Sequence, residues 1–158
     1  MSGPPNDASQ RRACFSQALK VLRRRRGLAT TQVATALGMS LRSYQNFEAG
    51  RGRLNVLRVH EVARILDADP YALLIAIDIG SADFAVRCID NKLAAILLMA
   101  LNDFDEAAGD QIALLDPATL MSLFKRAFDT LAGEARDRAA RARNWRGPNG
   151  PGRPPDLT

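Results

Sequence analysis

Residues that commonly carry out catalysis or hold a metal ion are few in this chain and far apart. His60 is the single histidine, and Cys14 and Cys88 lie 74 positions apart, a spacing that fits neither a zinc site nor a disulfide scaffold. The acidic residues between positions 103 and 110 lack the glycine and the ligand spacing of a calcium loop. The sequence has no nucleophile elbow, phosphate-cradling glycine loop or zinc-binding histidine pair. We therefore predict no metal site, no cofactor and no enzymatic activity.

Arginine, in contrast, is abundant and unevenly distributed. The chain has 22 Lys and Arg against 17 Asp and Glu, for a net charge of +5. Residues 1–64 hold twelve basic and three acidic side chains, whereas residues 65–143 hold eight and thirteen. A positive half of this kind is the electrostatic footprint of a protein that binds a polyanion. An arginine-rich solvated surface would show the same totals. Arg24 to Arg26 either flank such a surface or serve as partners of a helix dipole.

The length and composition are those of an ordinary globular protein. The 158 residues suffice for one domain with a second helical layer, and 47% hydrophobic with 25% charged residues is an average composition. The longest apolar run, at 93–101, is about half of the ~20 residues needed to span a bilayer. Residues 1–10 lack the basic and apolar regions of a secretory signal. We expect a reduced, soluble, cytoplasmic protein without a membrane partner.

Helical periodicity runs through the chain, and no stretch shows sustained alternation of apolar and polar residues. Ser40 and the pair Asp69–Pro70 have the residue types that begin helices. The first 80 residues predict five helices, at about 9–26, 30–37, 41–49, 56–66 and 70–80. Residues 83–108 are predicted to form one long helix whose middle is apolar almost all round, and a further helix begins at Asp116.

The segment 27–50, GLATTQVATALGMSLRSYQNFEAG, has a distinctive order of small, apolar and capping residues. Ala34 is small where two short helices must approach, and Gly38 permits the turn between them. This order resembles the helix-turn-helix of Cro and the phage repressors, the XRE class. The matching positions are Gly27, Leu28, Val33, Ala34, Leu37, Gly38, Ser40, Tyr44, Phe47, Glu48 and Gly50. The resemblance covers about residues 11–77 and implies a domain that binds double-stranded DNA.

By this resemblance, the exposed face of the third helix reads bases in the major groove. The implied base-reading residues are Leu41, Arg42, Ser43, Gln45 and Asn46. Arg42 has two parallel donors that match guanine O6 and N7, and Gln45 or Asn46 suits adenine. Leu41 offers only an apolar contact, to a thymine methyl group. The alternative for all five is an ordinary solvated helix face.

Four further residues are implied to hold the DNA backbone. Arg51 and Arg53 follow the third helix in a glycine-containing loop, where this class contacts phosphates. Ala29 stands where the class usually has a capping serine, and Thr30 where it has a phosphate-binding glutamine. The hydroxyl of Thr30 or Thr31 can cap the second helix and bind a phosphate, with a shorter reach.

Glu48 is acidic on an element that is implied to face DNA, which favours a structural role. In the XRE class, the Glu at this position pairs with an Arg of the first helix, and Arg23 is the aligned residue. We expect a structural ion pair between Glu48 and Arg23.

We therefore predict an all-α protein with a five-helix, lambda-repressor-like helix-turn-helix domain at 9–80 and a helical dimerisation region at 81–143. A flexible tail is predicted at 1–8 and a disordered, Pro/Gly-rich tail at 144–158. The helix predicted at 83–108 has more apolar surface than the helix after it can cover. The predicted dimer interface is Val86, Ile89, Leu93, Ile96 and Ala100. The alternative is that this surface packs only against the chain's own N-terminal domain.

The resemblance implies a sequence-specific, DNA-binding transcriptional regulator. We expect a repressor that binds a palindromic operator as a homodimer and associates with the nucleoid. The alternative is a protein-interaction adaptor, either antitoxin-like or an activator that recruits RNA polymerase, working mainly through its C-terminal helices. Site-selective binding with a steep salt dependence would favour the first function over the second.

Overall fold

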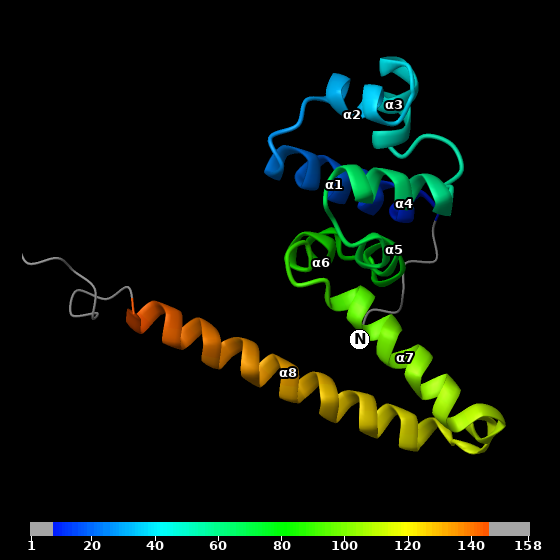
Figure 1. Ribbon diagram of the computed structural model, residues 1–158, viewed down its shortest axis with the longest axis vertical. Helices are drawn as coiled ribbons and strands as arrows, with labels where there is room; N and C mark the ends of the chain where they lie inside the picture. Colours follow the sequence, from blue (N-terminus) through cyan, green and yellow to red (C-terminus); the bar gives the residue numbers. More distant parts are fainter. Residues whose placement is uncertain (1–7, 146–158) are drawn as a thin grey trace, which may run out of the picture. The chain divides into compact units, whose positions relative to one another are not determined.

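The structure is a computed structural model that describes residues 8–145, and these residues form helices and loops without a strand (Figure 1). The fold is all-α, as predicted. The elements are α1 (Ala8–Arg25), α2 (Thr30–Ala36), α3 (Leu41–Glu48), α4 (Val56–Ile65), α5 (Pro70–Ile79), α6 (Ala82–Arg87), α7 (Leu93–Ala108), the 3-10 helix η1 (Gly109–Leu114) and α8 (Pro117–Trp145). The chain divides into two compact units, of which the first ends at Ala107 and the second begins at Ala108.

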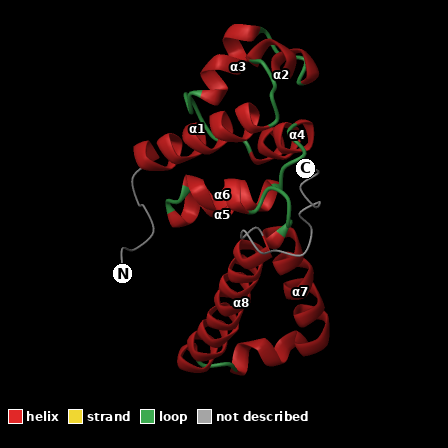
Figure 2. Cartoon of the chain, turned by 90° about the vertical axis from the view of Figure 1, so that its left-hand side faces the viewer, coloured by secondary structure: helices red, strands yellow, loops and turns green. Residues whose placement is uncertain are grey.

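Helix α1 is the scaffold of the first unit. It contacts α3, α5 and α6, and it crosses the unit with α2 and α3 on one side and α5 and α6 on the other (Figure 1, Figure 2). Phe15, Leu19 and Leu22 recur at helical spacing and are fully buried. Burial of each such side chain contributes about 1.5–3 kcal/mol. One helix therefore holds α3, α5 and α6 in a single core.

Side-chain caps begin two helices where the sequence predicts them. Ser40 Oγ accepts a hydrogen bond from Ser43 N–H at 3.1 Å. Asp69 Oδ1 accepts from the N–H groups of Tyr71 and Ala72 at 3.0 and 3.3 Å, and a proline occupies the first position of α5. A cap of this kind contributes about 1 kcal/mol, so α3 and α5 begin at defined residues.

The single helix predicted over 83–108 is wrong, because the chain forms α6 and α7 with a break between them. Lys92 lies in the break with a φ of +52°, a left-handed conformation that does not continue a helix. Helix α7 then begins with a bond from elsewhere in the fold: Oδ2 of the buried Asp69 accepts from Ala95 N–H at 2.9 Å. Asp69 thus caps α5 with one carboxylate oxygen and α7 with the other.

The first unit continues past the domain boundary predicted at Gly80, because α6 packs against α1 and α5. Ala82, Ala85 and Ile89 are buried in the same core as α1. The compact unit ends at Ala107 instead.

The tails predicted at 1–8 and 144–158 lie mostly outside the described residues. Ala8 is the first residue of α1, and Asn144 and Trp145 belong to α8. These three residues are therefore helical.

The second unit consists of η1 and the 29-residue helix α8. Asp116 precedes α8 and accepts from the N–H and the hydroxyl of Thr119 at 3.0 and 2.6 Å. These bonds lower the pKa of Asp116, because they favour its charged form. Along α8, Lys125 and Asp129 form an i,i+4 ion pair at 2.7 Å.

None of the residues of α8 is buried. Six of its apolar side chains recur at helical spacing on one face, which we call the α8 stripe. The stripe consists of Leu120, Leu123, Phe124, Ala127, Phe128 and Leu131. Phe124 is 55% exposed and Leu131 is 54% exposed. Within residues 8–145, no helix is long and apolar enough to cross a membrane.

Candidate nucleic-acid interface

A tight turn at Gly38 joins α2 to α3. Gly38 has a φ of +63°, which glycine adopts without the strain that a side chain would add. Gly38 N–H donates to the Thr35 carbonyl at 3.0 Å, and Met39 N–H donates to the Ala34 carbonyl at 2.9 Å. The side chain of Ala34 is buried in the core, and α2 and α3 contact each other. The predicted helix-turn-helix arrangement is therefore present.

Three polar side chains fix α3 to α1 from the inside. Arg23 Nε donates to Glu48 Oε1 at 2.6 Å, and Arg23 Nη2 donates to Glu48 Oε2 at 3.4 Å. The Tyr44 hydroxyl donates to the same Oε1 at 2.9 Å. Arg23 Nη1 also donates to the Leu28 carbonyl at 2.8 Å. The structure thus contains the expected ion pair and extends it to the loop that precedes α2.

This network holds the charge of Glu48 inside the protein. The side chains of Arg23 and Glu48 are only 11% and 7% exposed. The hydrogen bond from Arg23 to Glu48 raises the pKa of the guanidinium, and burial beside the Glu48 carboxylate raises the pKa of Tyr44. Because the carboxylate is buried and paired, it adds little negative potential to the outer face of α3.

The outer face of α3 carries the five predicted base-reading residues. Leu41, Arg42, Ser43 and Gln45 are exposed, and Asn46 is half-buried. The Arg42 guanidinium forms no hydrogen bond or ion pair with another residue of the described range. Its donors are therefore available to an external acceptor.

Two of the five are already engaged within the chain. The Ser40 hydroxyl donates to the Ser43 hydroxyl oxygen at 2.8 Å, and Arg51 Nη1 donates to Asn46 Oδ1 at 3.2 Å. Ser43 keeps its own hydroxyl proton, and Asn46 keeps two amide protons and a second lone pair on Oδ1. Both side chains are thus held in place while they retain capacity for one more partner.

The start of α2 differs from the expectation. We expected the hydroxyl of Thr30 or Thr31 to cap this helix, but its N-cap residue is Ala29, which forms no side-chain cap. Instead, Gln32 Oε1 accepts from Ala29 N–H at 2.7 Å. Sequence reasoning missed Gln32, although its place three residues after the N-cap is the signal for such a bond. Thr30 and Thr31 lie in the first turn of α2, half-buried and exposed respectively.

Arg51 and Arg53 both lie exposed in the loop between α3 and α4. Arg51 is joined to Asn46 by the bond described above, so the loop and the outer face of α3 form one continuous polar surface. Arg53 forms no hydrogen bond or ion pair with another residue in the part of the chain that the structure describes.

Arg26 has a role that sequence reasoning did not find. It was left open whether Arg24 to Arg26 flank a binding surface or complement the dipole of the first helix. Arg26 Nε donates to the Leu66 carbonyl at 2.8 Å, and its Nη2 donates to the Asp67 carbonyl at 2.7 Å. Arg26, the residue that follows α1, therefore binds the C-terminal end of α4.

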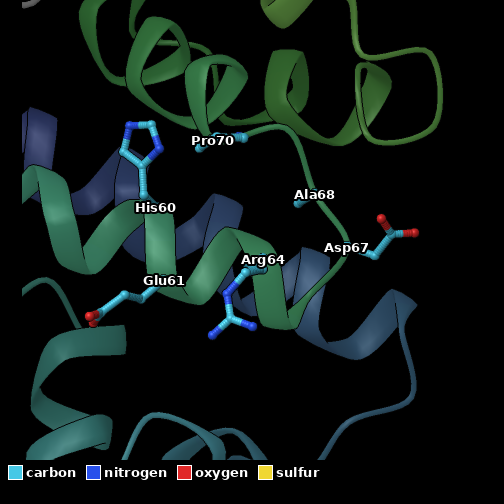
Figure 3. A pocket seen from close by; sticks show the side chains of 6 residues that line it. All are labelled: His60, Glu61, Arg64, Asp67, Ala68 and Pro70. Atoms are coloured by element: carbon cyan, nitrogen blue, oxygen red, sulfur yellow. The ribbon is translucent and has the colours of Figure 1, made fainter.

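A hollow near the end of α4 is lined by His60, Glu61, Arg64, Asp67, Ala68 and Pro70 (Figure 3). Figure 3 shows that its ionisable side chains diverge: His60 points toward Pro70, while Glu61, Arg64 and Asp67 point away from it. The His60 ring instead packs edge-on against Tyr71, with 5.1 Å between the ring centres. Among residues 8–145, no group of three or more His, Cys, Asp or Glu is placed to hold a metal ion.

The five residues predicted for a dimer interface are divided by the break between α6 and α7. Ile89 is 1% exposed and belongs to the core of the first unit, and Val86 packs against that core. Leu93 is half-buried, whereas Ile96 and Ala100 are exposed on α7. Of this set, only Ile96 and Ala100 on α7 are exposed, and Val86 and Leu93 are half-buried.

Comparison with known families matches residues 15–73 to a family model described as a helix-turn-helix domain. The match begins in α1, ends in α5 and includes the turn at Gly38. No curated protein and no solved structure matches the chain. Residues 15–73 are therefore similar to a helix-turn-helix domain, in agreement with the turn at Gly38 and the two helices that flank it.

Proposed function

We propose that this protein is a sequence-specific DNA-binding transcriptional regulator of the XRE, Cro-like class, acting on the nucleoid in the cytoplasm. The observation that carries the proposal is the division of charge on α3. Arg42 is exposed and unpaired among the described residues, whereas Glu48 is buried and paired with Arg23. This division suits a recognition helix, because an exposed carboxylate would repel the phosphates of the duplex.

In this proposal α3 enters the major groove and reads bases with its outer face. Arg42 binds guanine O6 and N7 through two parallel bonds, and Gln45 and Asn46 bind adenine. Ser43 donates its hydroxyl proton to a base acceptor, and Leu41 contacts a thymine methyl group. The bonds that hold Ser43 and Asn46 support the proposal, since a fixed side chain loses less conformational entropy on binding.

Phosphates on either side of these bases are bound by Thr30 and Thr31 at the start of α2 and by Arg51 and Arg53 after α3. The threonine side chains are short and uncharged, so the two arginines supply the electrostatic part of the binding to phosphates. Each phosphate that an arginine neutralises adds about 0.9 to the slope of log affinity against log salt concentration.

We further propose a homodimer that binds a palindromic operator, because a single helix-turn-helix contacts few base pairs. We assign the interface to the α7 part of the predicted set (Leu93, Ile96 and Ala100) together with the α8 stripe. Exposed apolar side chains on a helix commonly mark an interaction site.

The distribution of charge supports a second copy of the chain as the partner. Residues 93–124 hold five acidic and no basic side chains, whereas residues 125–145 hold six basic and three acidic. Because one copy carries segments of both signs, two copies of the chain can attract each other electrostatically.

We propose repression as the outcome, since a dimer that occupies an operator overlapping a promoter needs no further contact to block transcription. The exposed α8 stripe also favours a second candidate, a protein-interaction adaptor. It would work either as an antitoxin or by recruiting RNA polymerase. In that case α8 would bind a different protein, and DNA binding would be secondary or absent.

Selection of bound sites from a pool of random duplexes, followed by titration at two salt concentrations, tests the proposed function. We expect enrichment of a palindromic sequence and affinity that falls steeply with salt. A chain that enriches no sequence and shows no salt dependence would contradict the proposal and favour the adaptor. The position of the selected site relative to a promoter then tests repression: overlap with the core promoter supports it, and an upstream site favours activation.

A further inference from the structure

A hollow lies where the start of α1 meets the loop after α3. It is lined by Ser9, Arg12, Ala13, Ala49, Gly50, Arg51 and Gly52. The two segments touch because Gly50 has no side chain: a Cβ at this position would lie 2.5 Å from the Arg12 carbonyl oxygen. Gly50 also has a φ of +69°, a conformation that favours glycine. The position of Arg12 beside the loop is therefore fixed by the backbone.

The hollow is positively charged. Arg12 and Arg51 both line it, and none of the lining residues within 8–145 is acidic. The Arg12 guanidinium has no hydrogen bond or ion pair with any other described residue. Its neighbour Arg11, in contrast, pairs with Asp78 at 2.6 Å. Two arginines at one hollow without a carboxylate form a site that attracts an anion.

The hollow is connected to the outer face of α3. Arg51 lines the hollow and also donates to Asn46, one of the proposed base-reading residues. A nucleic-acid strand whose bases meet Asn46 would therefore bring its sugar–phosphate chain past Arg51 to Arg12. Planar guanidinium groups suit the paired oxygens of a phosphate.

We propose that this hollow binds a backbone phosphodiester of the DNA duplex, with Arg12 as a phosphate ligand that acts together with Arg51. This inference rests on the proposed function and adds a contact from α1 to those of α2, α3 and the loop. The contact is independent of base sequence, so it strengthens binding to every duplex and fixes the register of α3 in the groove.

The test compares full-length wild type with Arg12→Gln, Arg12→Lys and the control Arg87→Gln in titrations of labelled duplex from 50 to 200 mM salt. Arg87 is exposed on α6 and does not line the hollow, and its replacement changes the net charge equally. We expect Arg12→Gln to flatten the salt slope by about 0.9, so that wild-type affinity falls about 3.5-fold more than that of the variant over this range. Arg12→Lys should keep the wild-type slope, and Arg87→Gln should leave it unchanged.

The inference would be overturned if Arg12→Gln kept the wild-type slope of log affinity against log salt concentration. It would also be overturned if Arg87→Gln flattened that slope as much as Arg12→Gln does. In either case the proposed function would stand. A wild type that binds no duplex would overturn both. A final arm measures thermal stability in inorganic phosphate against chloride at equal ionic strength. A further outcome is that inorganic phosphate raises the melting temperature of wild type but not that of Arg12→Gln, while the two proteins have the same salt slope for duplex binding. In that outcome the hollow binds free phosphate and the DNA assignment is wrong.

Discussion

Arg51 Nη1 donates a hydrogen bond to Asn46 Oδ1 at 3.2 Å, which joins a loop residue to the outer face of α3. Under the proposed function, this bond links a phosphate contact to a base contact. The arginine occupies one lone pair of the Asn46 amide oxygen, which leaves the second lone pair and both amide protons available. The two residues are therefore expected to act as a unit.

A double-mutant cycle tests this coupling. Asn46→Ala and Arg51→Ala should each weaken binding to the selected operator. The double variant should lose less binding free energy than the sum of the losses of the two single variants. The interaction free energy should be about 0.5–1 kcal/mol, as for residues in direct contact. Arg53→Ala provides the matched control, since Arg53 lies in the same loop without that bond. Strict additivity between Asn46 and Arg51 would show that the bond does not persist on DNA.

Arg42→Ala should relax discrimination at one or two base pairs of the selected site. The expected cost at that site is about 1–3 kcal/mol, because the variant loses a bidentate contact to one base. Affinities for the selected duplex and for its single-base variants measure the effect. Arg53→Ala, which removes a loop arginine without a bond to a base-reading residue, should instead weaken all duplexes alike. Equal losses on selected and random DNA for Arg42→Ala would contradict its assignment as a base-reading residue.

Glu48→Gln should destabilise the fold with little effect on base preference. The change leaves the Arg23 guanidinium, whose side chain is 11% exposed, without a counter-charge. Loss of one partner of a buried ion pair costs about 3–5 kcal/mol, measurable as a lower free energy of unfolding in urea. The control is Glu61→Gln. Glu61 pairs with Arg58, whose side chain is 38% exposed, and loss of this surface ion pair should cost less than about 1 kcal/mol. A Glu48→Gln variant of wild-type stability would show that the buried pair contributes little.

Asp69→Ala should destabilise the first unit more than Asp69→Asn does. The carboxylate accepts from Tyr71 and Ala72 at the start of α5 and from Ala95 in α7, so alanine removes two caps at once. Each cap contributes about 0.5–2 kcal/mol, whereas asparagine keeps one acceptor oxygen. Urea unfolding of both variants measures the difference. Equal losses for the two variants would show that a single oxygen of Asp69 carries the whole effect.

The local part of the fold could be predicted because its signals lie in adjacent residues. Ser40 and Asp69–Pro70 have the residue types of helix starts, and Gly38 is the residue that a left-handed turn requires. The break between α6 and α7 could not be predicted in the same way. Beyond the break, Ala95 N–H of α7 donates to Asp69, 26 positions away in sequence, while the apolar spacing continues across the break.

The same distinction applies to the candidate site. Residues on one short helix, such as Arg42 and Gln45, share an exposed face by helical geometry alone. The place of Arg12 beside Arg51 depends on the close approach of two backbones at Gly50, and no residue near Arg12 in sequence indicates it. Sequence patterns therefore identify the face of α3 but not the hollow beside it.

The α8 stripe gives the last prediction, which concerns assembly. Light scattering of the full chain at micromolar concentration should give twice the 17.2 kDa mass of one chain. Phe128→Glu should shift the mass to that of a monomer, because the dimer would have to bury an unpaired carboxylate in an apolar interface. Ser122→Glu adds the same charge at an exposed position outside the stripe and should remain dimeric.

On DNA, the Phe128→Glu monomer should lose its preference for the palindrome over a single half-site, since one domain contacts only half of the operator. Circular dichroism checks that both variants keep their helix content. A monomeric wild type under these conditions would contradict the proposed homodimer. The α8 stripe would then bind a different protein, as the adaptor function requires.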